Sequence, residues 1–170
     1  MTSSTTQRQG ALDRRQAAEF EDFYRLHYGR VVRLAWLLTR SAGVAEDIAQ
    51  EAFMGLHSRF DTVQRPSAYL DRSVVYSCRS WIRRERIRRA YTPPAGDRPA
   101  ELAVADPAVM SAVSRLPYRQ RVVILMRYWG DWSEAEIAEA LRCRPGTVKS
   151  LGSRALTQLR KELDCDRATV

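Results

Sequence analysis

Apolar residues recur every three or four positions along most of this chain, which is the spacing that lines one face of an α-helix. Such stripes predict helices over residues 16–40, 41–60 and 66–89. Pro66 suits the first turn of the third helix, where its missing N–H group needs no partner. We therefore expect these three helices to form one small domain over residues 16–90.

The helical spacing is lost on both sides of this domain. The first 15 residues are mostly polar, and we expect a disordered tail there. Residues 91–107 contain four of the seven prolines and few large apolar residues, which predicts a flexible linker. Helical spacing resumes over residues 109–116 and 117–129. The predicted fold is all-α, with two small helical domains joined by a Pro-rich linker, the second domain over residues 108–165.

The second domain contains the pattern of a helix-turn-helix over residues 131–163. Ser133 and Glu136 have the spacing of a capping box at a helix start. The helical spacing is interrupted from Arg142 to Gly146, with Pro145 and Gly146 as a helix stop and a tight turn, and a second helix starts near Thr147. Its outward side carries residues that can donate to phosphates or base edges, namely Lys149, Ser150, Ser153, Arg154 and Thr157. This pattern is typical of a DNA-reading helix-turn-helix, although a helical hairpin with a solvated basic face has the same spacing.

Charge is distributed unevenly along the chain. The formal net charge of +8 favours a polyanionic partner such as nucleic acid. Residues 16–59 carry a net charge of −1, from five arginines and six acids, whereas residues 65–90 carry +6, from eight arginines and two acids. Tyr69, Tyr76 and Trp81 are interleaved with these arginines, which suits stacking on unpaired bases, although aromatics at helical spacing also serve as core.

The helix over residues 41–60 carries a second stripe beside its apolar one. This stripe, which we call the acidic stripe, consists of Asp47, Gln50, Glu51 and Met54. An acidic helix face ahead of very basic sequence is unusual in so short a domain. The acidic stripe is either a solvated surface or a docking surface for a basic or polar partner.

Other candidate chemistry is sparse. Cys78, Cys143 and Cys165 are widely spaced and fit free thiols in a reducing cytoplasm, with Cys78 as a core residue. His27 and His57 have no companions at ligand spacing, so no metal site and no cofactor are predicted. The sequence contains no signal peptide and no apolar run of about 20 residues, so we expect a cytoplasmic protein that is not inserted in a membrane.

Taken in order, these segments resemble the extracytoplasmic-function (ECF) class of bacterial RNA polymerase sigma factors over residues 16–163. AEDIAQEAF at 45–53 resembles the region-two helix that docks on the clamp helices of the polymerase's largest subunit. PSAYLDRSVVYSCRSWIRR at 66–84 is similar to the helix that melts and reads the minus-ten element. RLPYRQRVVILMRYWGDWSEAEIAEALRCRPGTVKS at 115–150 resembles region four, which reads the minus-thirty-five element.

The resemblance implies a role for each group of candidate residues. Contacts with core polymerase fall on the acidic stripe. Capture of flipped bases falls on the loop from Phe60 to Arg65. Contacts with the melted minus-ten strand fall on Arg72, Tyr76, Arg79 and Arg83. Contacts with the minus-thirty-five element fall on Lys149, Ser150, Ser153 and Arg154, with Arg144 and Thr147 on phosphates. Ser73, Tyr76 and Gly152 depart from the residues usual in the family, so no promoter sequence is predicted.

The expected partners are core RNA polymerase and promoter DNA, and we expect a monomer when the chain is free. The sequence does not determine whether an anti-sigma factor sequesters it. One alternative is a self-sufficient dimeric helix-turn-helix regulator, which leaves residues 45–53 unexplained. Another is a small nucleic-acid enzyme that holds Mg²⁺ at Asp47 and Glu51, but no further convergent carboxylates are evident. We therefore expect a transcription initiation factor and not an enzyme.

Overall fold

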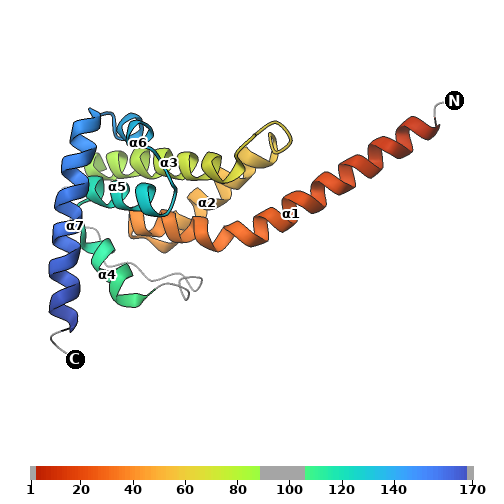
Figure 1. Ribbon diagram of the computed structural model, residues 1–170. Coiled ribbons are helices and arrows are strands. Elements are labelled where there is room, and N and C mark those ends of the chain that lie inside the picture. Colours follow the sequence, from red (N-terminus) through yellow and green to blue (C-terminus); the bar gives the residue numbers. More distant parts are fainter. Residues whose placement is uncertain (1–2, 89–105, 168–170) are drawn as a thin grey trace.

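The computed structural model describes residues 3–88 and 106–167, and these form seven α-helices without any β-strand (Figure 1). The helices are α1 (Ser3–Thr39), α2 (Ala42–His57), α3 (Pro66–Arg88), α4 (Pro107–Arg115), α5 (Tyr118–Tyr128), α6 (Glu134–Leu141) and α7 (Pro145–Arg167). The predicted all-α class is confirmed. None of the described helices combines the length and the apolar content that a membrane span requires.

The first three helices pack against one another through their apolar stripes, and we call them the N-terminal unit. The second half of α1 is buried from Val31 to Thr39 apart from Arg33, whereas its first half extends away from the other helices (Figure 1). The helix ends where Arg40 adopts a left-handed conformation with φ of 63°. This reversal brings α2 back against α1.

Helices α4 to α7 form the C-terminal unit, in which α7 contacts α4, α5 and α6. Asp106 caps α4, because its side chain accepts a hydrogen bond from the N–H of Ala108 at 2.9 Å, and Pro107 occupies the first helical position. Val148 and Ala155 of α7 are fully buried against the neighbouring helices. The outer side of α7 is thereby left to solvent.

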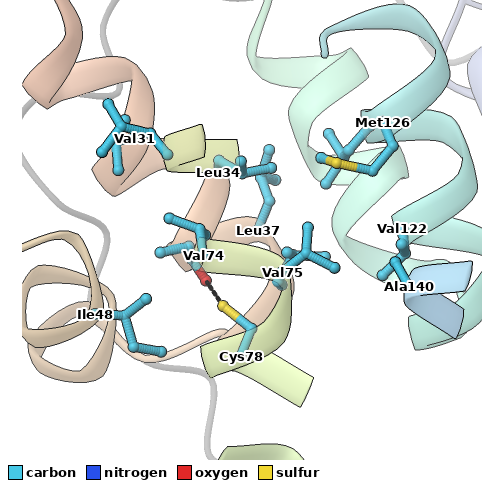
Figure 2. Packing of buried hydrophobic residues seen from close by; sticks show 14 of the residues in the cluster. Val31, Leu34, Leu37, Ile48, Val74, Val75, Cys78, Val122, Met126 and Ala140 are labelled. Atoms are coloured by element: carbon cyan, nitrogen blue, oxygen red, sulfur yellow. Dashed lines mark hydrogen bonds between the residues drawn. The ribbon is translucent and has the colours of Figure 1, made fainter. Parts of the chain in front are cut away.

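The two units share one apolar core. Figure 2 shows Leu37 of α1 and Val75 of α3 in the same cluster as Val122 and Met126 of α5. All four side chains are at most 1% exposed. Burying a side chain of this size contributes about 1.5–3 kcal/mol, so this shared core helps to hold the two units together.

Two predictions about local structure are wrong. The tail expected over residues 1–15 is helical from Ser3 onward, because residues 7–18 are rich in Gln, Arg and Ala, and an anchored helix extends without a new nucleation step. The interruption expected over 142–146 does begin at Arg142, which is left-handed with φ of 48°, but no tight turn follows at 145–146, because Pro145 already begins α7. The linker expected over 91–107 lies outside the described residues, except for its last two residues, which cap and begin α4.

Candidate nucleic-acid interface

The acidic stripe lies on the outer face of α2. Its four residues are all exposed, and Met54 is 74% exposed. The opposite face of the helix is buried through Ala45, Ile48, Ala52 and Leu56. A period of 3.6 residues separates these two faces, so the apolar stripe fixes the outward direction of the acidic one.

Helix α3 follows the same rule, with a buried apolar face and a cationic outer face. Leu70, Val74 and Cys78 are completely buried. The Sγ atom of Cys78 lies 3.9 Å from the carbonyl oxygen of Ala35 (Figure 2), and burial raises the pKa of this thiol well above its ordinary value. The prediction that Cys78 is a core residue is therefore confirmed, and its raised pKa makes it unreactive.

The loop between α2 and α3 is fastened to α1 by aromatic packing. The ring of Phe60 is half-buried and lies edge-on to Phe20, with ring centroids 5.2 Å apart, and 5.4 Å from Phe23. Arg65, at the other end of the loop, is exposed. Phe60 thus holds the position of the loop in addition to any contact that the loop makes with bases.

The candidate minus-ten residues on α3 are divided between solvent and the C-terminal unit. Tyr76 is 43% exposed and Arg83 is exposed, whereas Arg72 and Arg79 bond to α6. A groove of about 770 Å³ runs beside them, lined by residues that include Asp47, Glu51, Tyr76, Arg79, Arg83 and Arg142. The fold therefore brings two carboxylates of the acidic stripe and three of the candidate minus-ten residues on α3 to one groove.

The helix-turn-helix has the capping box that the sequence predicts. The Ser133 hydroxyl accepts from the N–H of Glu136 at 3.3 Å, and Oε2 of Glu136 accepts from the N–H of Ser133 at 2.9 Å. The pKa of Glu136 is lowered mainly by the hydrogen bond from the Ser133 backbone. The Ser133 hydroxyl and Arg72 add to this effect. The carboxylate therefore stays charged and keeps the start of α6 in place.

The outward side of α7 presents most of the candidate minus-thirty-five residues. Lys149, Ser150, Ser153 and Arg154 are exposed, as is Arg144 in the preceding turn, and Thr147 is half-buried. Lys149 Nζ lies 3.8 Å from Oε2 of Glu134, and the Ser150 hydroxyl donates to the carbonyl oxygen of Thr147 at 3.0 Å. Exposed pairs of this kind contribute little to stability, so these side chains are available to bind DNA.

Buried polar contacts also occur at positions that the sequence did not single out. Arg30 of α1 pairs with Asp71 of α3 at 2.7 Å, and Asp71 is only 3% exposed. Burial raises the pKa of Asp71, while the hydrogen bond from Arg30 opposes that change. Arg121 of α5 donates to the carbonyl oxygen of Leu37 at 2.6 Å, and burial, with a smaller contribution from Arg40, lowers its pKa to about 10. No local sequence signal identifies these partners, because they lie 41 and 84 residues apart.

Comparison with known proteins identifies both units. Residues 23–88 match the family model for sigma-70 region 2, and residues 107–159 match the model for sigma-70 region 4. The chain is 32% identical over 155 residues to the RNA polymerase sigma-E factor of Streptomyces coelicolor, covering 87% of this chain and 88% of that protein. It is also 32% identical to the ECF RNA polymerase sigma factor SigM of Mycobacterium tuberculosis, covering 85% of this chain and 76% of that protein.

A solved structure has a similar fold. The sigma factor RpoE of Bartonella quintana, crystallised in complex with the anti-sigma factor NepR, superposes with a TM-score of 0.66 at 22% identity. The superposition covers 87% of this chain and 98% of that one. The likeness extends over both helical units.

Proposed function

Because the chain belongs to the extracytoplasmic-function class of RNA polymerase sigma factors, we propose that it binds core RNA polymerase in the cytoplasm and directs it to specific promoters. It does so without catalysing a reaction itself, by reading the minus-thirty-five element as duplex and the minus-ten element as melted strand. The observation that carries this assignment is the separation of two exposed surfaces of opposite character. The acidic stripe on α2 is suited to a protein partner, and the polar and basic side of α7 is suited to the major groove.

In this proposal the cationic face of α3 binds the melted minus-ten strand. A melted strand presents unpaired bases, which stack on aromatic side chains with a contribution of about 1–3 kcal/mol per base. Tyr76 is 43% exposed on this face and lies near exposed Arg83. This combination suits a strand whose bases are splayed out and whose phosphates need cations.

Mapping of transcript starts tests the proposed function directly. Core polymerase is combined with the purified chain on genomic DNA, and the new start sites are aligned. We expect a set of starts absent with core alone, preceded by two shared sequence elements. A chain that binds specific duplex DNA as a dimer without polymerase, and adds no start sites, would contradict the proposal and favour a self-sufficient regulator.

Arg154→Ala is expected to relax base preference at one or two positions of the minus-thirty-five element. Arg154 is exposed on the outward side of α7, and arginine is a common partner of guanine in the major groove, where a good contact discriminates by about 1–3 kcal/mol. The measurement is transcription of a library randomised in that element by the variant holoenzyme. Arg144→Ala is the matched comparison, because a phosphate contact in the turn should weaken all sequences about equally. A uniform loss with Arg154→Ala would make Arg154 a phosphate contact.

Phe60→Ala is expected to reduce transcription from a duplex promoter much more than from a template with a premelted bubble. A residue that captures flipped bases helps to offset the cost of unstacking, and that cost is already met in a bubble. Phe60 also packs on Phe20, so Phe20→Ala is the control for loosening of the aromatic cluster. Phe20→Ala should affect both templates alike. The same pattern with Phe60→Ala would make Phe60 a packing residue only.

A further inference from the structure

Helix α7 continues well beyond the residues that are candidates for reading the minus-thirty-five element. It is a single unbroken helix from Pro145 to Arg167 (Figure 1), and the last of those candidates is Arg154. Further along the helix, Arg160 and Lys161 are both exposed, and we call them the distal cation pair. Neither the packing of the helices nor the proposed function accounts for these two charges.

The distal cation pair lies on the same side of α7 as the candidate reading residues. Positions eleven apart on an α-helix are separated by about three turns and share one side. Arg160 follows Lys149 by eleven positions, and Lys161 follows Ser150 by the same interval. The opposite side of the helix is buried through residues such as Ala155, which is 0% exposed. The pair therefore continues the outward side of α7.

The distal cation pair has no acidic partner in the part of the chain that the structure describes. The neighbouring Glu162 is already engaged, because its Oε2 atom lies 3.6 Å from Nη1 of Arg115 and its Oε1 atom accepts from Gln158 at 3.2 Å. Asp164 follows Arg160 at a spacing that allows ion pairs on a helix, yet among the described residues these two do not pair. Both positive charges are therefore available to a partner outside the chain.

The composition of this surface favours a polyanion over a protein partner. Protein interfaces are centred on large apolar side chains, and within the described residues none of the exposed large apolar side chains lies on α7. Between Arg154 and the pair, the exposed position is Thr157, whose hydroxyl already donates to the carbonyl oxygen of Ser153 at 3.0 Å. Two cations without an apolar neighbour are suited to phosphates, which proteins bind largely through arginine and lysine.

The length of the helix determines which part of the DNA the pair can reach. At a rise of about 1.5 Å per residue, Arg160 lies about 16 Å further along the axis than Lys149. The major groove is about 12 Å wide, and a recognition helix contacts base edges with its N-terminal residues. When Lys149 lies over the base edges, the pair is therefore beyond the edge of the groove, where the sugar-phosphate backbone runs.

We propose that the distal cation pair is a second DNA-binding site on α7, which binds phosphates at the edge of the major groove that the first half of the helix reads. The inference rests on the proposed function, because it takes the outward side of α7 to face the minus-thirty-five element. Phosphate contacts fix the position of a protein on the duplex without reading its sequence. The site ends before Asp164, which is also exposed, because a carboxylate repels phosphates.

The site is removed by Arg160→Gln with Lys161→Gln, which we call the distal variant. Glutamine is a good helix former, and both positions are exposed, so the distal variant should fold normally. The matched control is Arg15→Gln with Arg25→Gln, which removes the same charge from α1. Each of these arginines is exposed and pairs with a glutamate four residues away. Circular dichroism establishes that both variants are folded.

The first measurement is the salt dependence of holoenzyme binding to a fluorescently labelled promoter duplex. The duplex carries both elements of a start site that the wild-type chain adds to core polymerase. Each lost phosphate contact lowers the slope of log affinity against log salt concentration by about 0.9. We expect the slope of the distal variant to be smaller by about two and its affinity at physiological salt to be roughly tenfold lower or more. The control should keep both wild-type values.

The second measurement locates the phosphates. Uncharged methylphosphonate groups replace single phosphates along both edges of the minus-thirty-five element. At one or two positions the replacement should weaken wild-type binding by about fivefold and leave the distal variant unaffected, because that variant has already lost the contact. In a library randomised in the element, the base preference of the distal variant should match that of the wild type.

Two results would overturn the distal site. One is a salt slope of the distal variant equal to that of the wild type. The other is a reduced affinity that is not coupled to any methylphosphonate position, which would place the pair against an acidic protein surface of the polymerase. Neither result bears on the proposed function, which fails if the wild-type chain adds no start sites to core polymerase.

Discussion

Replacing Asp47 and Glu51 together with lysine is expected to weaken binding to core polymerase by roughly 30-fold or more, because loss of one partner of a desolvated interface charge pair costs about 2–5 kcal/mol. Both carboxylates are exposed on the outer face of α2, and neither forms an ion pair within residues 3–88 and 106–167. The buried side of α2 is untouched by the change. Helical content should therefore stay at the wild-type level.

A control with the same change in charge is available on α1. Glu19→Lys with Glu21→Lys also reverses two exposed carboxylates, and each of these makes only an exposed pair with an arginine four residues away. The control should keep wild-type binding, measured by anisotropy of a fluorescently labelled chain titrated with core polymerase. Normal assembly of the Asp47 and Glu51 variant would remove the acidic stripe from the docking surface.

Much of the candidate site follows from local periodicity, and for that reason it was predictable. The expected third helix, 66–89, agrees closely with α3, Pro66–Arg88. Once the apolar stripe of α2 is recognised, the exposure of Asp47 and Glu51 follows from helix geometry alone. The capping box at Ser133 is likewise a rule about residues three apart.

Predictions that depended on weaker local signals were the ones that failed. A Pro-Gly pair can form a turn, but proline is equally suited to the first turn of a helix. The left-handed Arg142 completes the reversal before Pro145 is reached. An arginine gives no local sequence signal for a left-handed conformation. The N-terminal tail was misjudged because polarity indicates solvent exposure and does not by itself indicate disorder.

The contacts between distant segments could not be predicted at all. Asp71 was counted among the charges of a cationic helix, yet it is buried against Arg30. The ion pair between Arg72 and Glu136 joins residues 64 positions apart. Periodicity shows which face of a helix is buried, but the identity of the neighbour is decided by how all the helices pack.

Asp71→Ala is expected to lower the free energy of unfolding by about 3 kcal/mol, the lower end of the range for breaking a buried ion pair. The loss leaves the Arg30 guanidinium, whose side chain is 22% exposed, with its charge uncompensated between α1 and α3. Partial access of Arg30 to water keeps the effect at the lower end. For a chain of this size the melting temperature should fall by roughly 6–12 °C.

The mechanism is tested by a double-mutant cycle followed by urea unfolding. Arg30→Met removes the uncompensated guanidinium charge. The double variant Asp71→Ala, Arg30→Met should therefore be more stable than Asp71→Ala alone. Glu19→Ala breaks the exposed pair with Arg15 and should cost no more than about 1 kcal/mol. If the two single effects simply add in the double variant, the cost of Asp71→Ala comes from the cavity that it leaves and not from the unpaired charge of Arg30.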